Sequence, residues 1–97
     1  MLGKAVQKVE GGKLLKITVE FDDVIDDVKI MGDFFLHPEE ALTQIENTLC
    51  GMPFDTTIED YAEEIAEVLY QTEADFVGVS VQNIAETIFE AVHAASV

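Results

Sequence analysis

The spacing of apolar residues changes once along the chain, near residue 32, and this change constrains the fold more than any other feature. In residues 15–21, Leu15, Ile17, Val19 and Phe21 alternate with polar residues. A spacing of two predicts a β-strand with one buried face and one solvated face. After residue 36, apolar residues recur every three or four positions, which predicts amphipathic helices. We therefore expect an α+β fold in which strands come first and helices second.

The strand region predicts a three-stranded antiparallel meander. Residues 4–9 form a short candidate strand, and the turn at residues 10–13 contains two adjacent glycines, which accept positive φ without steric cost. The alternating strand follows, and Asp22 and Asp23 open the next turn. A third strand over residues 25–31 ends at Gly32. Sequential strands with short connections usually pair with each other, and short turns make the pairing antiparallel.

The second part of the chain predicts about three helices packed on one face of the sheet. Pro38 suits the first turn of a helix, and Gly51 suits its end. Residues 56–59 resemble a capping box, and Ser80 is the expected N-cap of the last helix. Residues 75–79 are expected to be a loop or a short extended piece. The expected inward faces are Ala41, Leu42, Ile45, Thr48 and Leu49 in the first helix, Ile58, Tyr61, Ala62, Ile65, Val68 and Leu69 in the second, and Val81, Ile84, Ala85, Ile88, Phe89 and Val92 in the third.

Length and composition exclude several classes of protein. A chain of 97 residues makes one domain, residues 1–97. A net charge of −15 repels phosphate backbones, so a nucleic-acid partner is not expected. No run of apolar residues exceeds three, which argues against a membrane-spanning helix. The single cysteine, Cys50, leaves no intrachain disulfide and favours the reducing cytoplasm.

The charge is divided as sharply as the apolar spacing. All five lysines lie in the first 29 residues beside six acids, for a net charge of −1. The remaining fourteen acids lie after residue 29 without one Lys or Arg, and −1 with −14 gives −15. Five of these acids crowd one predicted helix: Glu59, Asp60, Glu63, Glu64 and Glu67. This acidic ladder is expected to face water, and the alternative is docking to a basic surface.

One stretch resembles a known family. A Gly-Gly turn at Gly11 and Gly12 enters the alternating strand, and the third strand runs into a Gly-Asp-Phe-Phe segment at residues 32–35. This order resembles the C-terminal accessory domain of lipoate–protein ligases. Later parts look similar as well: a Leu- and Glu-rich helix ends at Gly51, and a Gly-Val-Ser sequence at residues 78–80 opens the last helix. The resemblance covers about residues 4–93.

The resemblance implies a subunit without catalytic residues of its own. The catalytic domain of that family carries a double-arginine, glycine-rich segment and an essential lysine, whereas this chain has no arginine and no Gly-rich phosphate loop. It therefore looks like the small subunit of a two-part ligase of the archaeal type. The expected partner is the catalytic subunit, which would hold ATP, Mg²⁺ and lipoate, while this chain is needed for lipoyl-adenylate formation and binds no cofactor or metal. The indirect partners would be the lipoyl domains of 2-oxoacid dehydrogenase complexes or the glycine cleavage H protein.

The most specific segment is also the candidate site. We call residues 32–37 the corner, because they leave the third strand and lead toward the first helix. In an extended chain two adjacent aromatic side chains point in opposite directions, so one can enter the core while the other contacts a partner. The alternative is a purely structural role, in which the segment is a strand-to-helix turn and Asp33 bonds to the local backbone. The residues expected to contact the catalytic subunit are Gly32, Asp33, Phe34, Phe35 and His37.

Two other groups of residues suggest different chemistry. Cys50 could accept sulfur and pass it on, as in a sulfur-carrier or iron–sulfur-assembly protein. Its place at a predicted helix C-terminus among acids disfavours the thiolate that such a role needs. Asp33, His37 and Glu40 are too loosely spaced to be a convincing metal site.

Overall fold

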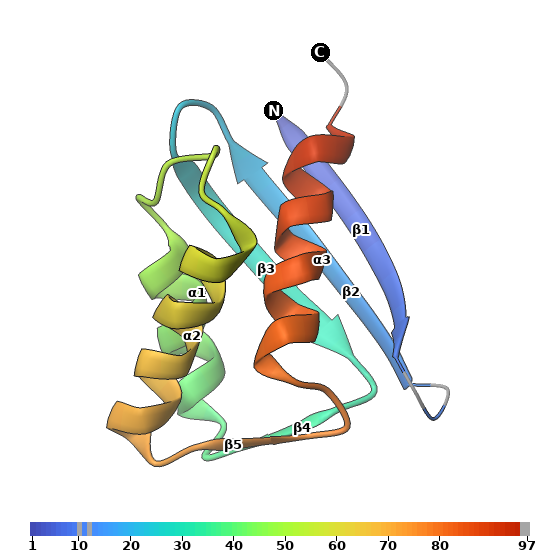
Figure 1. The fold of residues 1–97 in the computed structure, drawn as a ribbon, viewed down its shortest axis with the longest axis vertical. Coiled ribbons are helices and arrows are strands. Elements are labelled where there is room, and N and C mark those ends of the chain that lie inside the picture. Colours follow the sequence, from blue (N-terminus) through green and yellow to red (C-terminus); the bar gives the residue numbers. More distant parts are fainter. Residues whose placement is uncertain (10, 12, 96–97) are drawn as a thin grey trace.

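The first half of the chain folds into the expected meander. In the computed structural model, which describes residues 1–9, 11 and 13–95, strands β1 (Leu2–Val9), β2 (Lys13–Phe21) and β3 (Ile25–Gly32) form one antiparallel sheet in the order β1-β2-β3 (Figure 1). The glycine turn between β1 and β2 falls partly on residues 10 and 12, which lie outside the described residues. The α+β class and the three-stranded meander are thus confirmed.

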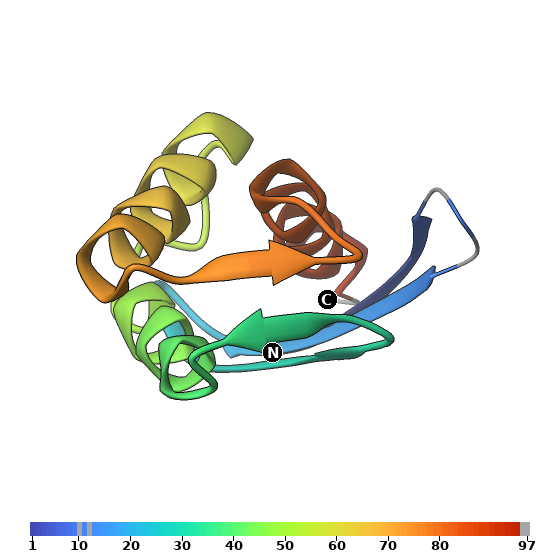
Figure 2. The same ribbon diagram turned by 90° about the horizontal axis from the view of Figure 1, so that it is seen from below.

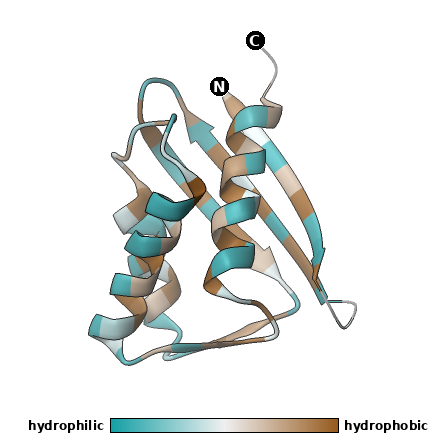
Figure 3. Ribbon diagram, viewed as in Figure 1, coloured by the Kyte–Doolittle hydropathy of each residue, from teal (hydrophilic) through white to brown (hydrophobic). Residues whose placement is uncertain are grey.

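The alternation along β2 sets the register of the whole sheet. Ile17 is fully buried and pairs with Ala5 on one side and with Ile30 on the other, so this row faces the helices. The next residues along each strand point to the opposite face. Figure 3 shows the result as hydrophobic and hydrophilic bands that alternate along β2.

The described part of the chain has three helices, which form a layer against the sheet as predicted, two of them in direct contact with it. Helix α3 (Val81–Ala94) packs on β1 and β2, and α1 (Glu40–Leu49) packs on β3. Helix α2 (Ile58–Thr72) packs on α1 and α3, farther from the sheet (Figure 2). None of the helices in the described part of the chain is long and apolar enough to cross a membrane.

Three details of the predicted helices are wrong. Pro38 precedes α1 instead of opening it, because residues 35–37 form a short strand and the helix begins only at Glu40. The N-cap of α2 is Thr57, whose hydroxyl oxygen accepts a bond from the backbone N–H of Asp60 at 3.2 Å; Thr56 instead donates its hydroxyl to the carbonyl of Pro53 at 2.6 Å. Thr48 is exposed and not part of the inward face. Ser80 caps α3 as expected and forms a capping box with Asn83.

A second, two-stranded sheet is the feature that sequence analysis missed. Strand β4 (Phe35–His37) pairs antiparallel with β5 (Asp75–Val77), in the region expected to be loop or extended. In Figure 2 this β4–β5 ribbon runs across one end of the molecule, between the sheet and the helices. Three residues are too few for a periodic pattern, so the pairing left no signal in the sequence.

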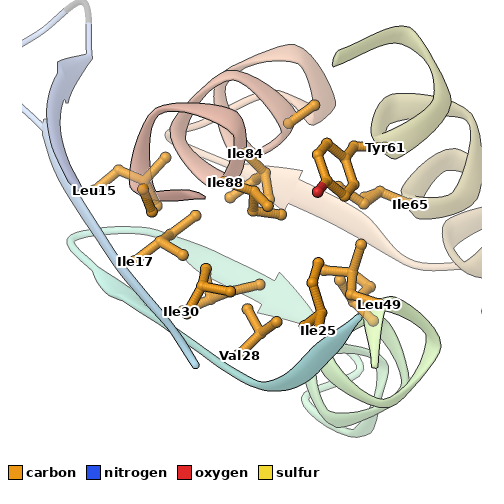
Figure 4. Close-up of a cluster of buried hydrophobic side chains, with 14 of the residues drawn as sticks. Leu15, Ile17, Ile25, Val28, Ile30, Leu49, Tyr61, Ile65, Ile84 and Ile88 are labelled. Atoms are coloured by element: carbon orange, nitrogen blue, oxygen red, sulfur yellow. The ribbon is translucent and has the colours of Figure 1, made fainter. Parts of the chain in front are cut away.

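The core lies between the three-stranded sheet and the helices. Leu15, Ile17 and Ile30 from the sheet point toward Ile84 and Ile88 of α3 (Figure 4). Tyr61, Ile65 and Leu49 extend the same cluster toward α1 and α2. The backbones of β1 and α3 approach closely at Gly3, where a Cβ atom would overlap the carbonyl of Ala91. Only glycine fits there, and it lets α3 lie directly on the sheet.

Candidate functional site

The corner begins at Gly32, where the chain leaves the three-stranded sheet. A Cβ atom on Gly32 would overlap the carbonyl oxygen of Leu14 in β2. The same oxygen accepts a hydrogen bond from the backbone N–H of Asp33 at 2.9 Å. This bond and the absence of a side chain hold the two backbones together while the chain turns away. Glycine at this position therefore fixes where the corner starts.

The two phenylalanines after Gly32 point in opposite directions. Phe34 is half-buried, and its ring meets the ring of Phe76 edge to face, with centroids 5.7 Å apart. Phe35 is 75% exposed, the second most exposed large apolar side chain in the described residues after Tyr70. The expectation that one ring packs inward and one faces solvent fits these positions, with Phe35 as the outward ring.

The β4–β5 ribbon presents a second apolar side chain beside Phe35. Phe35 pairs directly with Val77, which is 63% exposed, so both side chains lie on the same face of the ribbon. The next pair, Leu36 and Phe76, faces the core. The ribbon thus displays one aromatic and one β-branched side chain together in water. Val77 therefore extends the exposed apolar surface of the corner.

A groove of ≈ 450 Å³ runs beside Phe35. Its walls come from the end of β3, the corner and the first turn of α1. The groove is lined by Ile30, Met31, Gly32, Phe34, Phe35, Leu36, Glu39 and Leu42. This mostly apolar lining, with one carboxylate at the rim, could accept an aliphatic or aromatic side chain of a partner.

The polar residues of the corner are displayed at the surface. The side chains of Asp33 and His37 are exposed, and neither makes a side-chain hydrogen bond or ion pair with another described residue. The local backbone bond expected of the Asp33 side chain is therefore not made; only its backbone N–H is engaged. Within residues 1–9, 11 and 13–95, no three His, Cys, Asp or Glu side chains come close enough to hold a metal ion.

The surroundings of Cys50 disfavour the ionised form of its thiol. It is the C-cap residue of α1, half-buried, and its thiol donates to the carbonyl of Asp26 at 3.4 Å. Burial raises the pKa of the Cys50 thiol above its usual value, and the carboxylates of Asp27, Asp26 and Glu46 raise this pKa further. A backbone hydrogen bond at Val28 offsets only part of the effect. A sulfur acceptor needs a lowered pKa, so this environment disfavours the sulfur-carrier alternative.

The acidic ladder lies on the solvent side of α2. All five of its carboxylates are exposed, while Tyr61, Ile65 and Val68 of the same helix are buried. Tyr70, at 83% exposure, is the one large apolar side chain of α2 that the solvent reaches freely. Tyr70 is a single exposed aromatic at the end of the ladder, whereas the corner pairs Phe35 with Val77 beside a mostly apolar groove, so the corner is the better candidate site.

The fold and the corner define a small α+β module that exposes two paired apolar side chains, Phe35 and Val77, on its β4–β5 ribbon. Residues 6–88 match the family model described as the bacterial lipoate protein ligase C-terminus, and the chain belongs to that family. The resemblance stated from the sequence is thereby confirmed. No curated protein matches this chain.

A solved structure agrees with the family. The chain is similar to the small subunit in the structure of a bipartite lipoate protein ligase and its E2 lipoyl domain from the archaeon Thermoplasma acidophilum. The two chains share 26% identity with a TM-score of 0.75, and the match covers 91% of this chain and 94% of the archaeal one.

Proposed function

We propose that this protein is the non-catalytic small subunit of a two-part lipoate–protein ligase. In this role it acts with a large catalytic subunit in the ATP-dependent activation of lipoate to lipoyl-adenylate. The observation that carries the proposal is the nearly end-to-end match with one subunit of a bipartite enzyme. The family match over residues 6–88 supports it independently.

The catalytic subunit would supply every reactive group. It would bind ATP, Mg²⁺ and lipoate, and it would guide the lipoate carboxylate to the α-phosphorus of ATP with release of pyrophosphate. The present chain would dock beside that site through the corner and order mobile loops around the nucleotide. Holding two reactants in near-attack geometry lowers a barrier without any added reactive side chain.

The corner is the proposed contact with the catalytic subunit. Gly32, Phe34 and Phe35 line an apolar groove, and the side chains of Asp33 and His37 are exposed in the same segment. Phe35 and Val77 are exposed to solvent as well. Exposed aromatic side chains beside a pocket are typical of the residues that dominate binding energy at interfaces. We place the resulting heterodimer in the cytoplasm, with lipoyl domains of 2-oxoacid dehydrogenase complexes or the glycine cleavage H protein as indirect partners.

Reconstitution tests this function. The purified chain is mixed with the catalytic subunit encoded in the same genome, and pyrophosphate release from ATP and lipoate is measured. We expect adenylate formation only when both subunits are present. When ready-made lipoyl-adenylate is supplied instead, transfer to an acceptor domain should depend much less on this chain. Equal adenylate formation with and without the chain would overturn the proposal.

A further inference from the structure

No helix of the described residues covers the outer face of the three-stranded sheet. Helix α3 packs on the opposite face, with α2 beyond it and α1 beside β3 (Figure 2). Two rows of paired residues define this open sheet face. They are Lys4, Thr18 and Lys29 in one row and Val6, Lys16 and Met31 in the next.

Most of the positive charge of the molecule lies on this face. Lys4, Lys16 and Lys29 belong to its two rows, and Lys8 points to the same side beside Leu14. All four lysines are exposed, and none forms an ion pair with a carboxylate of the described residues, where the single ion pair joins the N-terminal ammonium to Asp22. The chain has twenty acids for five lysines. The next row of the same face carries the carboxylates of Glu20 and Asp27, but neither forms an ion pair with a lysine in the described residues. The four ammonium groups are therefore left available to another molecule.

Apolar side chains lie between the lysines. Val6 is 56% exposed, Met31 50% and Leu14 44%. Apolar surface enclosed by charges is typical of sites that bind other proteins. Met31 also lines the groove beside Phe35, so the open sheet face and the corner form one continuous surface.

We propose that the open sheet face binds an acidic face of the catalytic subunit, next to the contact made by the corner. This inference rests on the proposed function. Lysine ammonium groups attract carboxylates, while the nine acids of α1, α2 and α3 repel them from the helical side. An acidic surface of the partner is thus steered to the sheet in one orientation.

Other occupants fit the face less well. A nucleic acid would meet a molecule of net charge −15, and no aromatic side chain of the open sheet face is available to stack on a base. A second copy of this chain carries the same charge of −15 and is repelled at long range. An acidic partner protein can offer both carboxylates and apolar atoms.

The experiment compares two variants that change net charge equally. Lys16→Gln/Lys29→Gln removes two charges from the open sheet face, and Gln44→Glu/Gln71→Glu adds two negative charges at exposed helix positions. Binding to the catalytic subunit is measured by calorimetry without ATP or lipoate, so that it is judged separately from stimulation of adenylate formation. Thermal unfolding of each variant confirms that it is folded.

We expect Lys16→Gln/Lys29→Gln to raise Kd about fivefold to thirtyfold, mainly through slower association, and the control pair to change Kd by less than about twofold. Lys16→Arg/Lys29→Arg should bind like the wild type. Equal Kd for the two charge-changed variants would overturn the inference even where wild-type stimulation is normal. So would an unchanged Kd combined with lost binding of a lipoyl acceptor domain, or self-association of the free chain that the lysine substitutions abolish. If the wild-type chain binds but does not stimulate, the proposed function fails and the inference is still decided by the Kd comparison.

Discussion

At the scale of single residues, the adjacent Phe34 and Phe35 are expected to have different roles: the inward ring of Phe34 in stability and the exposed ring of Phe35 in binding. Phe35 is 75% exposed, so Phe35→Ala should change the free energy of unfolding by less than about 0.5 kcal/mol. The same change should weaken the complex with the catalytic subunit by about 2 kcal/mol or more if the ring is an interface anchor. Titration calorimetry and urea unfolding measure the two effects.

Phe34→Ala provides the matched comparison. It removes the edge-to-face contact with Phe76, so it should lower the free energy of unfolding of the free chain more than it lowers the affinity for the catalytic subunit. Wild-type affinity in Phe35→Ala would remove the corner from the interface. The sequence could predict that the two rings diverge, because alternation in an extended chain demands it. It could not predict which ring faces out, because that depends on pairing with β5.

Cys50 gives a prediction in alkaline solution. Its pKa in the folded chain lies above the ordinary value of 9.0, because of burial first and nearby carboxylates second. The neutral thiol's contribution to stability is therefore fully present below pH 9.0 and is lost as the pH rises through the folded pKa. From about pH 8 to about pH 11, the wild type should lose more stability than Cys50→Ala, measured by urea unfolding.

Tyr61 does not confound this comparison. Burial also raises its pKa, but Tyr61 is present in both proteins and its effect cancels. Cys50→Ala should leave partner-stimulated ligation intact. Loss of that activity in a folded variant, or rapid reaction of the wild-type thiol with alkylating reagents at neutral pH, would favour the sulfur-carrier alternative instead.

At the scale of elements, the end of β3 decides whether the corner forms. Gly32→Ala places a Cβ atom against the carbonyl of Leu14 and disturbs the bond that Asp33 makes to it. We expect a loss of more than about 2 kcal/mol in stability and weaker binding of the catalytic subunit. Gly51→Ala is the control: the φ of Gly51 is +91°, but no atom of the described residues lies within 4 Å of the added Cβ, so this substitution should cost only about 1–2 kcal/mol. Urea unfolding of both variants checks the order, and equal losses would refute the close-approach argument.

The elements also show where sequence reasoning reached its limit. The meander and the three helices follow from local spacing and caps, such as the alternation through Leu15 and Ile17 and the N-cap at Ser80. The β4–β5 ribbon depends on residues 35–37 meeting residues 75–77, and no local pattern carries that information. Gly3 was missed for the same reason, since its close approach to Ala91 exists only after α3 has docked on the sheet. Sequence analysis therefore named Gly32 and Phe35 as candidate contact residues, but it could not name Val77, which joins them only through the pairing of β4 with β5.

At the scale of the whole molecule, the uneven division of charge is expected to lower stability through repulsion among the acids. The sheet holds the lysines, whereas the helices and their connections hold the fourteen acids after residue 29, a region with no Lys or Arg. Added NaCl shortens the Debye length from about 10 Å at 0.1 M to about 3 Å at 1 M, so it should screen this repulsion. We expect Tm to rise with NaCl at neutral pH, measured by circular dichroism.

Two single substitutions localise the effect. Glu63 lies four residues from both Glu59 and Glu67 on α2, and each like-charge pair at this spacing costs about 0.2–0.5 kcal/mol. Glu63→Gln should therefore raise Tm at low salt and reduce its salt dependence, with little effect on complex formation. Glu40→Gln removes the same charge from the first turn of α1, where the helix dipole favours a carboxylate, so it should not raise Tm. A Tm that is independent of salt, or equal gains from both substitutions, would mean that the acidic ladder does not destabilise the fold.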